Sequence, residues 1–97
     1  MEVLVLPSKH LKLVAGTVSH RGEQISGVHV FLERIGGMRT AFLETSDESG
    51  HFRFQGIEEG RYKLWTCLAG WNELHFEIRL NRKGSQELLT LEMQLSN

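Results

Sequence analysis

The alternation that decides the fold starts after Gly27, where the chain reads Val28-His29-Val30-Phe31-Leu32-Glu33. Successive side chains of an extended strand point to opposite sides, so residues at every second position share a face. Val28, Val30 and Leu32 are therefore predicted to face a core. His29 and Phe31 then face outward. This pattern is typical of a strand that buries one face and exposes the other.

The same alternation recurs along the chain, and glycine-bearing turns separate the alternating segments. The turns are about ten residues apart, which favours an antiparallel sandwich or barrel over βαβ units. The segment from Leu88 to Leu95 also has a composition that suits a helix, but its strict alternation favours a strand. We expect strands over 11–18, 27–34, 39–45, 51–55, 61–68, 73–80 and 87–95, with a short extra strand over 2–6.

Size and composition predict one small domain. The 97 residues suffice for a single core, which we place in 11–97, with 1–10 as an N-terminal arm or extra strand. The formal net charge is -1 and Lys and Arg are spread along the sequence, so we expect no nucleic-acid partner.

The lone cysteine, Cys67, excludes an intrachain disulfide. The longest apolar run is far too short to insert into a membrane and no secretion-signal pattern is present, so we expect a soluble chain of unknown compartment.

Five blocks of the sequence, in this order, resemble the carboxypeptidase regulatory-like domain. They are Ala15-Gly16-Thr17-Val18, the segment 25–32, the segment 45–54, the segment 56–64 and Ala69-Gly70-Trp71. The resemblance implies an all-β fold, a seven-stranded Greek-key β-sandwich of the transthyretin (prealbumin) type. It also implies a non-catalytic accessory module, of the kind found beside peptidase domains or in bacterial surface proteins, and hence an extracytoplasmic setting. Related sandwiches bind starch.

One glycine in these blocks has a direct physical interpretation. Gly16 lies inside an expected strand, where a glycine indicates a bulge or the close approach of another backbone.

The side chains that could carry chemistry are few. A zinc site needs three or four ligands close together, and no two of the five histidines lie within four residues of each other. We expect solvated histidines, no metal and no cofactor. Asp47-Glu48-Ser49-Gly50 lacks the alternating carboxylates of a calcium loop and is interpreted as a turn. No nucleophile elbow, P-loop or metalloprotease motif is present, so we expect no enzyme. An enzyme of unknown type remains the weaker alternative.

The candidate binding residues are Phe31 and Trp65, bordered by His29 and Lys63. If strands 27–34 and 61–68 are neighbours, these side chains form one outward patch. Exposed aromatic residues on a sheet mark contact with a protein or stacking against a sugar. We therefore expect a protein partner, a neighbouring domain or a second copy of the chain, with carbohydrate as the alternative.

Two observations limit this prediction. The arm 1–7 could cover the patch with Val3 and Val5, which would make the aromatic residues structural. Trp71, which follows Gly70 at a strand exit, is interpreted as a packing residue.

Overall fold

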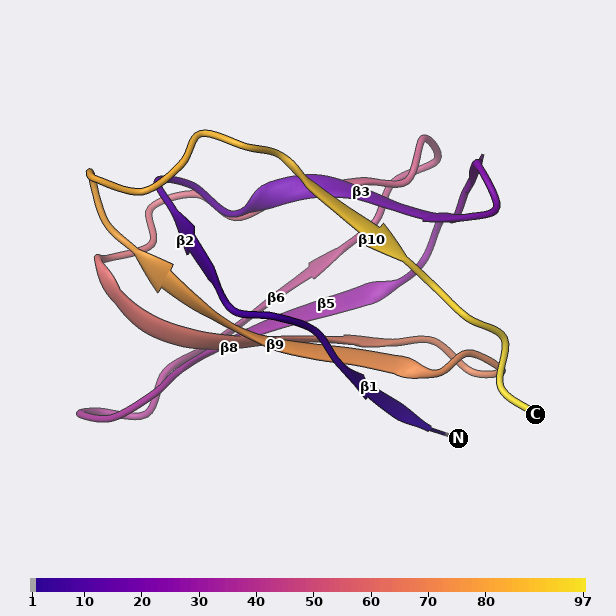
Figure 1. Ribbon diagram of the computed structural model, residues 1–97, viewed down its shortest axis with the longest axis horizontal. Coiled ribbons are helices and arrows are strands. Elements are labelled where there is room, and N and C mark those ends of the chain that lie inside the picture. Colours follow the sequence, from indigo (N-terminus) through magenta and orange to yellow (C-terminus); the bar gives the residue numbers. More distant parts are fainter. Residues whose placement is uncertain (1) are drawn as a thin grey trace.

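The computed structural model describes residues 2–97, which form ten β-strands and no helix. The strands make two mixed sheets that lie one above the other, an all-β arrangement compatible with a β-sandwich (Figure 1). Because the described residues contain no helix, none of them forms an apolar helix long enough to cross a bilayer. The strands are β1 (Val3–Val5), β2 (Lys9–Leu11), β3 (Ala15–His20), β4 (Glu23–Gln24), β5 (His29–Arg34), β6 (Ala41–Thr45), β7 (His51–Arg53), β8 (Gly60–Cys67), β9 (Glu73–Leu80) and β10 (Leu89–Glu92).

The larger sheet has the order β1-β9-β8-β5-β6, and β2 also pairs with β9. The smaller sheet has the order β10-β3-β4, and β7 also pairs with β3. In Figure 1, β3 and β10 form the upper layer, while β5, β8 and β9 lie in the lower one. The chain therefore crosses between layers several times, and residues far apart in sequence become neighbours.

Each of the seven main segments predicted from the alternation overlaps a strand, and β9 has the predicted bounds 73–80. The predicted strand 11–18 is wrong as a single element, because the chain changes sheets within it. Leu11 pairs with Leu80 of the larger sheet, whereas Ala15 pairs with Arg53 of the smaller one. Within the segment 88–95, Leu89–Glu92 forms the strand β10 rather than the alternative helix, and the two-residue β4 has no counterpart among the predictions.

The expectation of purely antiparallel pairing is also wrong. β10 runs parallel to β3, and β1 and β2 run parallel to β9. Tight hairpins enforce antiparallel neighbours, but none of these pairs is joined by one. About 70 residues separate β3 from β10, so their relative direction follows from packing and not from a turn.

The predicted inward positions are confirmed. Val28, Val30 and Leu32 are fully buried, and the equivalent positions of β8 and β9 join them in one core between the sheets. Leu95 continues the alternation of the buried Leu89, Leu91 and Met93 but is 57% exposed. β10 ends at Glu92, and beyond it only an isolated bridge from Trp71 holds Leu95 near the sheet.

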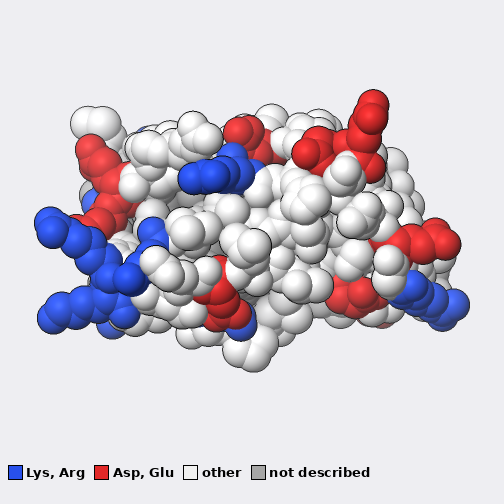
Figure 2. All heavy atoms as spheres, turned by 90° about the horizontal axis from the view of Figure 1, so that it is seen from above, with Lys and Arg blue, Asp and Glu red and all other residues white. Residues whose placement is uncertain are grey.

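The fold sorts the charges that are mixed in the sequence. Figure 2 shows a cluster of Lys and Arg side chains at one end of the face in view, with some Asp and Glu beside it, and mainly Asp and Glu at the other end. The loops 35–40, 54–59 and 81–88 lie at the first of these ends, which we call the basic end.

Candidate functional site

The outer face of the larger sheet carries a row of apolar and aromatic side chains that crosses five strands. Phe31 of β5 pairs with Leu43 of β6 on one side and with Trp65 of β8 on the other. Trp65 pairs with His75 of β9, which in turn pairs with Val5 of β1. Paired residues of adjacent strands point to the same side of a sheet. We call this row of five residues the aromatic row.

The three rings of the aromatic row are stacked face to face. The centroids of Phe31 and Trp65 are 4.9 Å apart with an interplanar angle of 9°. Those of Trp65 and His75 are 6.2 Å apart at 19°. β8 lies between β5 and β9, so Phe31 and His75 lie on opposite sides of the indole and cover both of its faces. The rings therefore present their edges outward, and their spacing is fixed by the strand register.

The sequence-predicted border residues flank this stack. The His29 ring is 6.4 Å from Phe31 and its Nδ1 lies 3.2 Å from the hydroxyl of Thr45. The Lys63 ammonium is 5.8 Å from the centroid of Trp65, within the range of a cation–π contact. The structure thus places the four predicted residues, Phe31, Trp65, His29 and Lys63, on one surface.

The arm does not cover the row: the two ends of the row are exposed, and its three central rings are partly buried. We considered that Val3 and Val5 might lie across the rings, but β1 instead pairs alongside β9 and extends the sheet. Val3 is 54% exposed, Val5 79% and Leu43 51%. The arm from Glu2 onward therefore adds apolar surface to the face. Met1 belongs to the predicted arm but lies outside the described residues.

Sequence reasoning missed Leu43, His75 and Val5 as members of this surface. The alternation placed His75 on an outward face, but it did not say which strand would be its neighbour. Pairing with Trp65 and Val5 depends on the register between strands, which the sequence pattern leaves open.

Not every histidine is solvated as predicted. His20 Nδ1 lies 2.7 Å from the carbonyl of Met93, and its ring meets Trp71 edge-on at 5.1 Å. His75 Nε2 lies 2.8 Å from a carboxylate oxygen of Glu73. Both side chains are mostly covered, whereas the other three histidines are exposed. Within residues 2–97, no three His, Cys, Asp or Glu side chains gather in a way that could hold a metal ion.

The two tryptophans lie in different surroundings. Trp65 belongs to the outer face of the larger sheet, whereas Trp71 packs against the core and against His20 of the smaller sheet. They do not share a stacking pair, and Trp71 has the packing role that the sequence predicted for it.

The outer face of the smaller sheet offers a contrast. Its outward positions on β3 and β10 are polar, with Thr17, Ser19, Thr90 and Glu92 along the paired strands. Leu88 is the exposed apolar side chain beside them. The paired outward positions of these two strands therefore carry no counterpart of the aromatic row.

A comparison with protein-family models gives no match, and a comparison with curated proteins gives none either. The resemblance to the carboxypeptidase regulatory-like domain thus remains a prediction from five blocks of sequence.

Proposed function

We propose that this chain is a non-catalytic interaction module that docks a protein partner, a neighbouring domain or a second copy of itself onto the aromatic row. The observation that carries the proposal is the register that aligns Leu43, Phe31, Trp65, His75 and Val5 across one sheet face, with partly buried rings between two exposed ends. Soluble proteins rarely leave a contiguous apolar patch in water, and such patches mark contact surfaces.

The aromatic composition of the row and the stacking of its rings favour a protein as the occupant. Aromatic side chains dominate the energetic centres of protein interfaces, since they bury large areas at little entropic cost. Stacking already fixes Phe31 and Trp65 in place, so a partner would lose little side-chain freedom on binding. Lys63, Glu33 and Glu77 lie side by side next to the row and supply the polar rim that interfaces usually have.

Carbohydrate binding receives less support from the same geometry. A sugar ring stacks on the open face of an aromatic ring, but Phe31 and His75 occupy the two faces of Trp65. Trp71 packs edge-on against His20 and contacts the core. Neither tryptophan therefore offers a free platform, and titration with a soluble glucan should leave tryptophan fluorescence unchanged.

We further propose the Greek-key topology of transthyretin-like sandwiches, as the sequence resemblance implies. The order β6-β5-β8-β9 in one sheet and β7-β3-β10 in the other supports it, since sequential strands are exchanged between the layers. The additional strands β1 and β2 extend the first of these sheets at its β9 edge.

The test uses exposed residues whose substitution leaves the core intact. Val5→Ser and Leu43→Ser remove the two open ends of the row, and Leu88→Ser is the matched control on the opposite sheet. Sedimentation velocity over a range of protein concentrations would detect a second copy, and affinity capture would detect another protein. We expect the wild type and Leu88→Ser to retain the same complex and the row variants to lose it.

Two results would contradict the proposal. One is a wild-type chain that stays monomeric and captures only proteins that the row variants capture equally well. The other is a complex that Leu88→Ser abolishes while Val5→Ser and Leu43→Ser leave it intact.

A further inference from the structure

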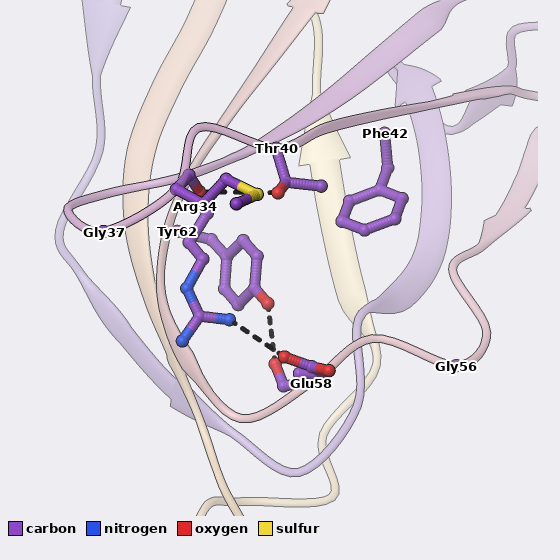
Figure 3. Close-up of a pocket in the computed structure, with 8 residues that line it drawn as sticks. Arg34, Gly37, Thr40, Phe42, Gly56, Glu58 and Tyr62 are labelled. Atoms are coloured by element: carbon purple, nitrogen blue, oxygen red, sulfur yellow. Dashed lines mark hydrogen bonds and ion pairs between the residues drawn. The ribbon is translucent and has the colours of Figure 1, made fainter.

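A pocket of about 460 Å³ opens at the basic end of the molecule, away from the aromatic row. It lies between the β5–β6 loop and the loop that precedes β8, and Figure 3 shows eight residues that line it. Phe42, Met38 and the ring of Tyr62 supply apolar lining, and Arg34 supplies the positive charge. Gly37 and Gly56 line the opening, and no atom lies within 4 Å of where their Cβ atoms would be.

The guanidinium of Arg34 packs near an aromatic ring and fits beside a glycine. Its central carbon lies 5.9 Å from the centroid of the Tyr62 ring. A Cβ at Gly60 would lie 3.1 Å from Nη2, so the absence of a side chain there makes room for the group. Tyr62 is itself fixed, because its hydroxyl donates a 2.7 Å hydrogen bond to the carbonyl of Glu58. A cation positioned in this way loses little freedom when it binds an anion.

The present partner of Arg34 is a weakly held carboxylate. Nη1 lies 3.5 Å from Oε2 of Glu58, at the long limit of a hydrogen bond. The Glu58 side chain is 87% exposed and that of Arg34 is 32% exposed. Exposed ion pairs of this kind contribute little, so the Glu58 side chain can leave at small cost. Its main chain stays anchored by Tyr62, as the dashed lines in Figure 3 show.

Among the residues that line the pocket, Arg34 is the cation. The nearby Arg39 and Arg61 already pair with Glu33 and Glu77, so the charge that attracts an anion into the pocket is that of Arg34. Glu58 shows that a carboxylate reaches the guanidinium, and the lining of Phe42, Met38 and Tyr62 suits an apolar body attached to it.

We propose that this pocket binds an organic carboxylate with an apolar body, such as the C-terminal residue of a peptide or a small aromatic acid, and that Glu58 occupies the anion position when no ligand is bound. The carboxylate would take the place of the Glu58 side chain on Arg34, and the apolar body would lie against Phe42 and Tyr62. This site is distinct from the aromatic row and does not depend on its function.

The test is a titration of the whole chain with N-acetylphenylalanine, followed by amide chemical shifts in two-dimensional NMR. Its neutral match is N-acetylphenylalanine amide, which has the same apolar body and no charge. We expect the acid to bind in the millimolar range, with shifts around residues 34–40 and 54–62, and the amide to bind at least about tenfold more weakly. A peptide ending in Phe, with its amidated form, distinguishes a peptide terminus from a free small acid as the ligand.

Two substitutions give opposite predicted effects. Arg34→Gln should weaken binding of the acid by about tenfold or more, because the charge-assisted bonds are lost. Glu58→Gln should strengthen it about two- to fivefold, because the competing carboxylate is gone. Glu59→Gln is the control: it removes the same charge one residue away, keeps an acceptor for the amide of Arg82, and should change affinity less than about twofold.

Equal binding of acid and amide would overturn the proposal, as would the absence of shifts with ten-millimolar acid. Equal strengthening by Glu58→Gln and Glu59→Gln would also contradict it, since the effect would then be a general one of net charge. The Glu58→Gln result stays informative even if Arg34→Gln disturbs the loop.

Discussion

Replacing Gly16 by alanine should destabilise the fold severely, because two backbones meet at this residue. Gly16 of β3 pairs with Leu89 of β10 in the parallel ladder, and a Cβ added here would overlap the carbonyl group and nitrogen of Leu89. Both colliding groups are main chain, so no side-chain rotation relieves the overlap. Since non-bonded contacts to carbon optimally lie near 3.5 Å, β10 would have to move by roughly 1 Å or more.

The cost follows from what β10 holds in place. Leu89, Leu91 and Met93 are all at least 97% buried between the sheets. Forcing an extra carbon into a packed site costs about 1–3 kcal/mol, and partial withdrawal of three core side chains adds about 1–2 kcal/mol more. We expect a loss of about 3–5 kcal/mol in the free energy of unfolding. For a domain of this size that is a large part of a total of roughly 5–15 kcal/mol.

Urea unfolding followed by tryptophan fluorescence measures the change, with linear extrapolation to water. Gly37→Ala is the control. It makes the same glycine-to-alanine change, but at an open position, where φ is +64° and a Cβ would meet no other residue within 4 Å. It should cost only about 1–2 kcal/mol, the penalty of a left-handed backbone conformation for alanine. If Gly16→Ala unfolds within 1 kcal/mol of the wild type, the close approach of β3 and β10 is refuted.

Three further predictions concern the core and its hydrogen bonds. Ser46→Ala should cost about 2–4 kcal/mol in urea unfolding, because the buried hydroxyl bridges a backbone amide and a backbone carbonyl at 2.9 and 2.8 Å; a loss below 1 kcal/mol would contradict this. Leu64→Ala should cost about 2–5 kcal/mol and Trp65→Ala only about 1–2 kcal/mol, since Leu64 faces the core and Trp65 the outer surface. A larger loss of stability for Trp65→Ala than for Leu64→Ala would contradict this assignment of the two faces of β8. Tyr62→Phe should cost about 1 kcal/mol and speed amide hydrogen exchange in residues 54–59, because the bond to the Glu58 carbonyl is lost; unchanged exchange there would show that this bond does not hold the loop.

The close approach at Gly16 shows how far one residue can be interpreted from sequence. A glycine inside an alternating segment predicted either a bulge or the close approach of another backbone, and the structure shows the close approach. The identity of that backbone, β10 running parallel, could not be predicted, because about 70 residues separate the two strands and no short turn fixes their direction.

The candidate site, too, was predictable from the sequence only in part. Alternation alone placed Phe31 and Trp65 outward, and the expected neighbourhood of their two strands is confirmed by the pairing of β5 with β8. For the segment 2–6 the sequence left two possibilities, an extra strand or a cover over the patch. It forms the strand β1, because Leu4 packs against the core and leaves Val3 and Val5 outside.

The sequence by itself determined where the strands lie and which side chains face the core, because that information repeats every two residues and needs no distant partner. Only the tertiary structure decided which strands are adjacent, in which direction and in which register. These choices depend on packing between segments far apart in the chain, which local patterns do not encode. The aromatic row, the basic end and the Arg34 pocket all arise at this second level, since each joins residues from several strands or loops.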